Sequence, residues 1–225
     1  MAGDPGNAMN RGDPRTVVRS GWNQASEKYR GDRAACDAFG HTDQEYREWL
    51  RPLFEELAQG SLVLDLGCGC GVPADRMLVE RFRVTGVDIS DVQIERARRL
   101  VPAAEFLRAD MTELEFPDGR FGGVLALYSL IHVPLDDQPP MLRRIHRWLR
   151  PGGLGLVITG HAAFTGYDAN WLGSPGAMFW SHADADTYQR WLEESGFHVR
   201  ERQFVPEGET GHELFLVVRA ERRAP

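Results

Sequence analysis

The sequence contains few cysteines, has no excess of basic residues and lacks a long apolar run. Only 3 of its 225 residues are cysteine, which is too few for a disulfide framework, so we expect a cytoplasmic protein. A formal net charge of −7 argues against nucleic-acid partners, because phosphate binding needs clustered Lys and Arg. The apolar runs fall short of the roughly 18 residues that span a bilayer, so we expect no membrane partner. The Gly-, Pro- and Asp-rich start does not resemble a secretory signal, and residues 1–14 are predicted to form a mobile tail.

Two of the cysteines, Cys68 and Cys70, lie two residues apart and raise the question of a metal site. With only Cys36 elsewhere, they do not complete a tetrahedral set of ligands. We therefore interpret them as small residues that fill a tight turn, and we expect no metal.

The sequence does contain a regular alternation of strand and helix patterns from Ser61 onward. Parallel strands need a covering helix between them, so this alternation predicts an α/β fold with a Rossmann-like, doubly wound and mostly parallel sheet. Two final strands joined by a short turn must pair as an antiparallel hairpin. The predicted strands are 61–66, 82–90, 104–110, 121–130, 154–159, 197–205 and 212–220, and the predicted helices are 72–82, 91–101, 136–153 and 184–196.

Two further segments lie outside this alternation. Residues 14–32 and 43–60 show helical patterns, and we expect 15–60 to form a helical lid. Residues 161–181 lack a regular period and are rich in glycine and aromatic residues, so they are predicted to be a long loop. No linker is long enough to divide the chain, which predicts a single domain over 15–225.

The segment LDLGCGCGV (64–72) places three glycines at alternate positions directly after the first predicted strand. Gly67 and Gly69 let the backbone approach a ligand, while Gly71 lets the strand and the next helix pack closely. Residues 69–74 also satisfy the dinucleotide fingerprint G-x-G-x-x-G/A, so the glycines alone leave the ligand open. Asp88 ends the second strand and suits a ribose in either case, because a carboxylate accepts from both hydroxyl groups.

Taken together, the motifs resemble those of the class I S-adenosylmethionine-dependent methyltransferases over nearly the whole chain. LDLGCGCG resembles their first motif, an acid followed by G-x-G-x-G, and here supplies Asp65. VTGVDIS resembles the second motif, whose acid holds the ribose, here Asp88. FLRADMTEL resembles the third, whose acid faces the adenine amino group, here Asp110 with Met111 beside it. LRPGG before a strand and a terminal hairpin are also typical of the family, and the aromatic segment 179–197 is similar to its small-molecule members.

This resemblance implies S-adenosylmethionine as the cofactor, bound by a core at 61–160. Glycine-turn amides would meet its carboxylate, and Asp65 would favour its amino group. Each acid also has a local alternative: Asp65 would cap the turn after it, Asp88 the next helix and Asp110 the short segment that follows. The residues assigned to the cofactor are Tyr29, Asp65, Gly67, Gly69, Gly71, Asp88, Ile89, Asp110, Met111 and Tyr128.

Several motifs of other methyltransferases are missing. No acid follows the fourth strand and no Asp-Asp-Asn cluster is present, so a magnesium-dependent site is not expected. The N/D-P-P-Y/F tetrad of adenine and amide methyltransferases and the Pro-Cys pair of cytosine enzymes are also missing. We therefore expect metal-independent methyl transfer to an oxygen, or else a nitrogen, of a small molecule by a monomer or homodimer.

Methyl transfer requires an aligned nucleophile in a dry pocket, and a base where that nucleophile must lose a proton. His132 is the first candidate base, with anchoring of the following loop as its alternative. His182 is the second, although Ser181 and Asp184 form an S-x-x-D pattern that would place it at a helix start. Residues expected to contact the acceptor, or else to fill the core, are Trp22, His132, Tyr167, Trp171, Phe179 and Trp180.

Two other functions stay open alongside the methyltransferase. The same glycine turn would serve an NAD(P)-dependent oxidoreductase, although the single small domain and the closing hairpin count against it. A non-catalytic protein that binds S-adenosylmethionine is the third reading.

Overall fold

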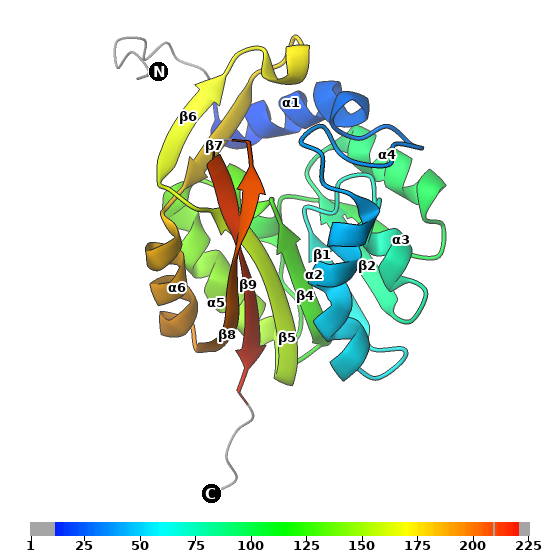
Figure 1. Ribbon diagram of the computed structural model, residues 1–225, viewed down its shortest axis with the longest axis vertical. Coiled ribbons are helices and arrows are strands. Elements are labelled where there is room, and N and C mark those ends of the chain that lie inside the picture. Colours follow the sequence, from blue (N-terminus) through cyan, green and yellow to red (C-terminus); the bar gives the residue numbers. More distant parts are fainter. Residues whose placement is uncertain (1–11, 209, 221–225) are drawn as a thin grey trace, which may run out of the picture.

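A seven-stranded sheet forms the centre of the molecule (Figure 1). The computed structural model describes residues 12–208 and 210–220, so most of the expected N-terminal tail lies outside the described residues. The first five strands in spatial order pair in parallel and the last two are antiparallel, which confirms the predicted topology. In spatial order they are β3 (Glu105–Arg108), β2 (Arg83–Asp88), β1 (Leu62–Leu66), β4 (Phe121–Leu127), β5 (Leu149–Gly160), β9 (Thr210–Arg219) and β8 (Phe197–Glu207).

Helices cover both faces of this sheet (Figure 1). Their apolar residues recur every three or four positions, as in Leu50 and Leu53 of the second helix, which are completely buried against the sheet. Burial of each such side chain stabilises the fold by about 1.5–3 kcal/mol. One face carries α2 (Asp43–Glu56), α3 (Ala74–Leu78) and α4 (Asp91–Leu100), and the other carries α5 (Gln138–Trp148) and α6 (Ala185–Glu194).

Two predicted boundaries are wrong. Helix α3 spans only five of the eleven residues predicted for it, since the chain turns after Leu78 and Phe82 packs into the core from that turn. Helix α5 ends at Trp148 rather than within the RPGG segment. That segment belongs to β5, where Gly152 has a φ of +73° and the register with β4 shifts.

The expectation of a long loop at 161–181 is also wrong. The segment contains β6 (Phe164–Asp168) and pairs it antiparallel with β7 (Met178–His182). This hairpin has its own small core with the first helix, α1 (Pro14–Tyr29), which includes Trp171, Met178 and Phe179. Trp171 and Phe179 are therefore core residues, although Phe164 is 53% exposed, and the absence of a helical period reflects a hairpin.

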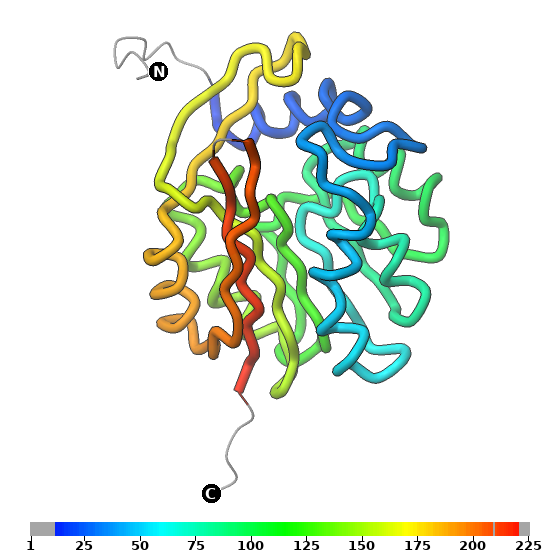
Figure 2. The backbone as a smooth tube through the Cα atoms, viewed as in Figure 1, coloured from blue at the N-terminus to red at the C-terminus, as the bar shows by residue number. Residues whose placement is uncertain are grey.

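The two N-terminal helices do not act together as a lid. Helix α1 lies with the β6–β7 hairpin across the carboxyl ends of the parallel strands, whereas α2 packs on a face of the sheet (Figure 2). Hydrogen bonds tie α1 to the start of α4: Ser90 donates to Asn23 at 2.7 Å, and Ser26 donates to Gln93 at 2.7 Å. Within the described residues, no helix is both long and apolar enough to cross a membrane.

Candidate active site

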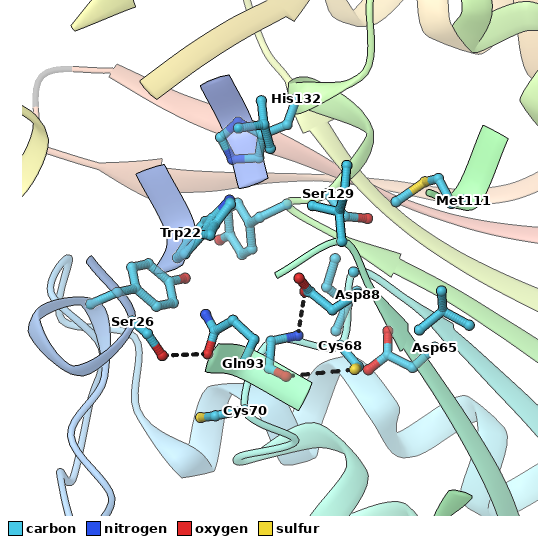
Figure 3. Close-up of a pocket in the computed structure, with 18 of the residues that line it drawn as sticks. Trp22, Ser26, Asp65, Cys68, Cys70, Asp88, Gln93, Met111, Ser129 and His132 are labelled. Carbon is cyan, nitrogen blue, oxygen red and sulfur yellow. Dashed lines mark hydrogen bonds between the residues drawn. The ribbon is translucent and has the colours of Figure 1, made fainter. Parts of the chain in front are cut away.

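A pocket opens beneath α1 at the carboxyl ends of β1, β2 and β4 (Figure 3). It lies where the strand order reverses between β1 and β4, the place where open α/β sheets bind their ligands. The structure brings together nine of the ten residues that the sequence assigned to the cofactor. These are Tyr29, Asp65, Gly67, Gly69, Asp88, Ile89, Asp110, Met111 and Tyr128.

The glycine turn shows why each glycine is needed. Gly67 has a φ of +78°, and a Cβ there would lie 2.2 Å from that of Ser129. Gly69 has a φ of +54°, but a Cβ there would meet nothing closer than the Gln93 side chain at 3.7 Å, so its surface is open to a ligand. Gly71 does not line the pocket. A Cβ there would lie 3.1 Å from Val101 and 3.2 Å from Phe106, in agreement with its predicted packing role.

Asp88 holds the turn in place from the end of β2. One carboxylate oxygen accepts from the Gly69 amide at 3.0 Å and the other from the Ser90 amide at 2.8 Å. The cap of α4 is Ser90, whose side chain accepts from Gln93, so the alternative that Asp88 caps this helix is wrong. Burial raises the pKa of Asp88 to about 6, although the two amides act in the opposite direction. Each oxygen keeps a lone pair for a further donor such as a ribose hydroxyl.

Asp65 lies at the end of β1 and is only 3% exposed. Within the part of the chain that the structure describes, no backbone amide donates to its carboxylate, so the capping alternative finds no support. Burial raises the pKa of Asp65, an effect that the neighbouring side chain of Asp75 opposes through a hydrogen bond. The Asp65 carboxyl thus forms a buried part of the pocket wall and can carry a negative charge there.

Asp110 shows that a capping role and a place in the pocket are compatible. One of its oxygens accepts from the amide of Thr112 at 2.8 Å and from its hydroxyl at 2.7 Å, so the predicted cap is present. The other oxygen pairs with Arg15 of α1 at 2.9 Å. Arg15 also pairs with Asp137 at 2.5 Å, which fastens the start of α1 over this end of the pocket.

His132 lines the pocket from the short turn after β4 and is 9% exposed. Its Nδ1 lies 2.7 Å from the Phe179 carbonyl oxygen. Because a carbonyl only accepts, Nδ1 carries the proton and Nε2 keeps a lone pair. Burial lowers the pKa of His132 to about 4, so the ring is neutral at physiological pH. The histidine thus anchors the β6–β7 hairpin, whereas its predicted alternative role was to anchor the loop that follows it, and it also presents an acceptor atom.

His182 does not line this pocket, and its predicted place at a helix start is wrong. It lies in β7, and the cap of α6 is Asp184, which accepts from the Thr187 amide at 2.8 Å. The ring packs against Gly160, where a Cβ would lie 1.9 Å from Nδ1. The His182 imidazole is therefore packed against the end of β5, outside the pocket.

Of the residues expected to contact the acceptor, only Trp22 and His132 line the pocket. Trp22 is held edge-on against His132, with ring centroids 5.6 Å apart, and against Trp171 at 4.9 Å. The remaining candidates belong to the core between α1 and the hairpin, which places them behind the pocket wall. These are Tyr167, Trp171, Phe179 and Trp180.

Sequence reasoning missed several lining residues on α1. Arg30 is 2% exposed, its terminal nitrogens reach the His41 carbonyl and Asp43, and its Nε has no partner among the described residues. The signal was available, because the lining residues of α1 recur three or four positions apart along one face of the helix. They are Arg15, Val18, Trp22, Ser26 and Tyr29, and Arg30 follows directly at the end of the helix.

Among residues 12–208 and 210–220, no three or more His, Cys, Asp or Glu side chains are grouped so that they could hold a metal ion.

The sequence of the chain is similar to those of known methyltransferases. A family model described as a methyltransferase domain matches residues 63–153. The chain is 37% identical over 161 residues to the 27-O-demethylrifamycin SV methyltransferase of Amycolatopsis mediterranei, a match that covers 66% of this chain. The same match covers 58% of that relative, so the chain spans less than two thirds of its length.

Solved structures show the same fold. The 1,6-didemethyltoxoflavin-N1-methyltransferase of Burkholderia thailandensis, with bound 1,6-didemethyltoxoflavin and S-adenosylhomocysteine, is similar with a TM-score of 0.68 and 22% identity, covering 96% of this chain and 94% of that one. The [4+2]-cyclase SpnF is similar with a TM-score of 0.72 and 18% identity, covering 92% and 96%.

The fold and the pocket define a Rossmann-like α/β protein with a ligand cradle at the switch point of its sheet. Residues 63–153, which contain the glycine turn and the strand-end acids, match a methyltransferase-domain model, and the chain shares the fold of solved methyltransferases.

Proposed function

We propose that this protein transfers a methyl group from S-adenosylmethionine to an oxygen or nitrogen of a small molecule, without a metal. The observation that carries the proposal is the gathering of Asp65, Asp88, the glycine turn and His132 around one pocket. The name of the 27-O-demethylrifamycin SV methyltransferase supports an oxygen as the acceptor atom. The name of the 1,6-didemethyltoxoflavin-N1-methyltransferase supports a nitrogen.

The residues at the glycine turn fit the cofactor. When bound, S-adenosylmethionine supplies a methyl group already activated by a positively charged sulfur. The open surface of Gly69 and the free lone pairs of Asp88 suit the ribose, and Asp65 suits the amino group. Arg30 brings a buried guanidinium with an unpartnered Nε to the same pocket, and we assign it to the carboxylate.

We assign Trp22 and His132 to the acceptor side, where Tyr29 and Tyr128, which the sequence assigned to the cofactor, complete a largely aromatic wall. Such a chamber excludes water and aligns the nucleophile, which is most of what methyl transfer needs. The neutral His132 accepts a hydrogen bond at Nε2 from the acceptor's O–H or N–H group. Its low pKa makes it a weak base, but a hydroxyl becomes strongly acidic as it gains the methyl group, so a weak base suffices.

Binding and turnover test this proposal. Calorimetry with S-adenosylmethionine, S-adenosylhomocysteine, NADH and NADPH should give heat only with the first two compounds. Labelled methyl transfer to a panel of hydroxyl- and amine-bearing small molecules should give product, with and without EDTA. Binding of NADH or NADPH alone would overturn the proposal in favour of the oxidoreductase. Cofactor binding without product from any acceptor would favour the non-catalytic reading, and loss of turnover in EDTA would overturn metal independence.

A further inference from the structure

Asp75, in the first turn of α3, is a buried acid that the proposed chemistry does not use. It is 0% exposed, and no amide, hydroxyl or cationic group of the described residues donates to either of its oxygens. An ionised carboxylate in such surroundings would be severely destabilised. The only group within hydrogen-bonding reach among the described residues is the carboxyl of Asp65, itself 3% exposed.

Two buried carboxyl groups hydrogen-bond to each other only if one of them carries a proton. No cation offsets a second charge: the titratable groups that face the pair are Cys68 and Cys70 of the turn, Asp88 of β2 and Tyr46 of α2. The cation on that side, Arg30, lies over the Tyr46 ring and is paired with Asp43. The pair therefore holds at most one negative charge at neutral pH, since burial raises the pKa of Asp65 itself to about 7.

Position decides which acid keeps the proton. Asp65 lines the pocket, whereas Asp75 does not and is enclosed between the turn and α3. Burial and the neighbouring Asp65 raise the pKa of Asp75 well above its usual range, and the hydrogen bond from Asp75 favours the ionised form of Asp65. The charge is thus left on the group that faces the ligand.

We propose that Asp75 is a positioning residue for the cofactor: its protonated carboxyl donates a hydrogen bond to Asp65 and holds that carboxylate ionised and oriented toward the cofactor's amino group. The inference rests on the proposed contact between Asp65 and that amino group. It differs from a packing role because it requires a hydrogen-bond donor at position 75, and not only a side chain of the right volume.

Three substitutions separate donor from filler. Asp75→Asn keeps a donor of the same shape, Asp75→Leu keeps the volume without a donor, and Asp75→Ala removes both. Calorimetry with S-adenosylhomocysteine should show wild-type affinity for Asn and a roughly 10- to 100-fold higher Kd for Leu and Ala at pH 7, the usual effect of one lost hydrogen bond to a charged group. The deficit of Leu should be larger at pH 6 than at pH 8, because Asp65 without its donor ionises at higher pH.

Thermal unfolding without ligand provides the second readout. Leu should be at least as stable as the wild type, because it replaces a buried polar group by an apolar one, so its weaker binding is not a folding defect. Wild-type affinity in Leu and Ala, or a loss in Asn equal to that in Leu, would overturn the inference. If Leu does not fold, the comparison of Asn with Ala decides. Asp65→Asn tests the underlying assignment separately: normal binding by that variant, or no binding by the wild type, would contradict the proposed function instead.

Discussion

Replacing Asp88 by asparagine should separate ligand binding from stability. Asp88 is half-buried in the wall of the pocket, and its pKa of about 6 compares with 3.8 for an exposed aspartate. That difference corresponds to a cost of about 3 kcal/mol for keeping the group ionised at neutral pH. Asparagine removes this cost but turns an N–H group toward Gly69 or Ser90, which costs about 1–3 kcal/mol. The two effects nearly cancel, so the ligand-free stability at pH 7 should change little.

Ligand binding by the same variant should weaken strongly. Asparagine keeps one neutral acceptor where Asp88 offers two charged ones to the ribose, a loss of about 2–4 kcal/mol or roughly 30- to 700-fold in Kd. Calorimetry with S-adenosylhomocysteine measures this change. Asp91→Asn is a matched control, because Asp91 begins the same helix, is half exposed and does not line the pocket.

The pH dependence of unfolding checks the charge itself. The folded state raises the pKa of Asp88, so it binds the proton more tightly than the unfolded chain does. The stability from this group is therefore fully present below about pH 4 and is lost as pH rises to about 6. Asp88→Asn should lack that share of the decline. An asparagine variant that binds S-adenosylhomocysteine as tightly as the wild type, or that is unfolded at pH 7, would refute the reasoning.

Three further predictions follow from the site. His132→Ala should lower turnover by roughly 10²-fold or more, and His132→Gln should be nearly as slow. The wild-type rate should stay flat from pH 6 to 8, because the pKa of His132 is about 4. A rate that falls as the pH drops through about 6.5 would contradict this prediction. Gly67→Ala and Gly69→Ala should both lower the free energy of unfolding, because both positions have a positive φ, and the loss should be larger at Gly67, by about 1–3 kcal/mol in total, because a Cβ there would also collide with Ser129. Gly69→Ala should in addition weaken cofactor binding in calorimetry, and equal losses in thermal melts of the two variants would contradict the reasoning. Arg30→Gln should raise the Kd for S-adenosylhomocysteine about tenfold, and unchanged binding in a titration would remove Arg30 from the carboxylate.

The sequence predicted well which residues of the glycine turn and strand ends line the pocket, because that side of the pocket is local. Asp65 and the glycines follow one strand, and Asp88 ends the next. In a parallel sheet, strand ends meet at one edge, so their order along the chain already brings them together. The positive φ values at Gly67 and Gly69 are likewise a backbone requirement that the residue type reveals.

The acceptor side was predicted less well because it depends on contacts between distant segments. The aromatic residues of 161–181 lack a helical period, and only the pairing of β6 with β7 turns Trp171 and Phe179 into core. His132 became an anchor with a low pKa because the Phe179 carbonyl and the surrounding burial come from another part of the chain. No sequence pattern gives the desolvation that sets this pKa.

The sequence by itself determined the mostly parallel sheet with its closing hairpin and placed acids at strand ends, since hydrophobic period and strand-end position are short-range properties, whereas the strand order came from the tertiary structure. Only the tertiary structure decided that α1 covers the pocket while α2 covers the sheet, and that His182 lies outside the pocket. It alone also brought Asp75 against Asp65. These outcomes depend on which surfaces meet and on how much water they exclude, and both are settled only when the whole chain packs.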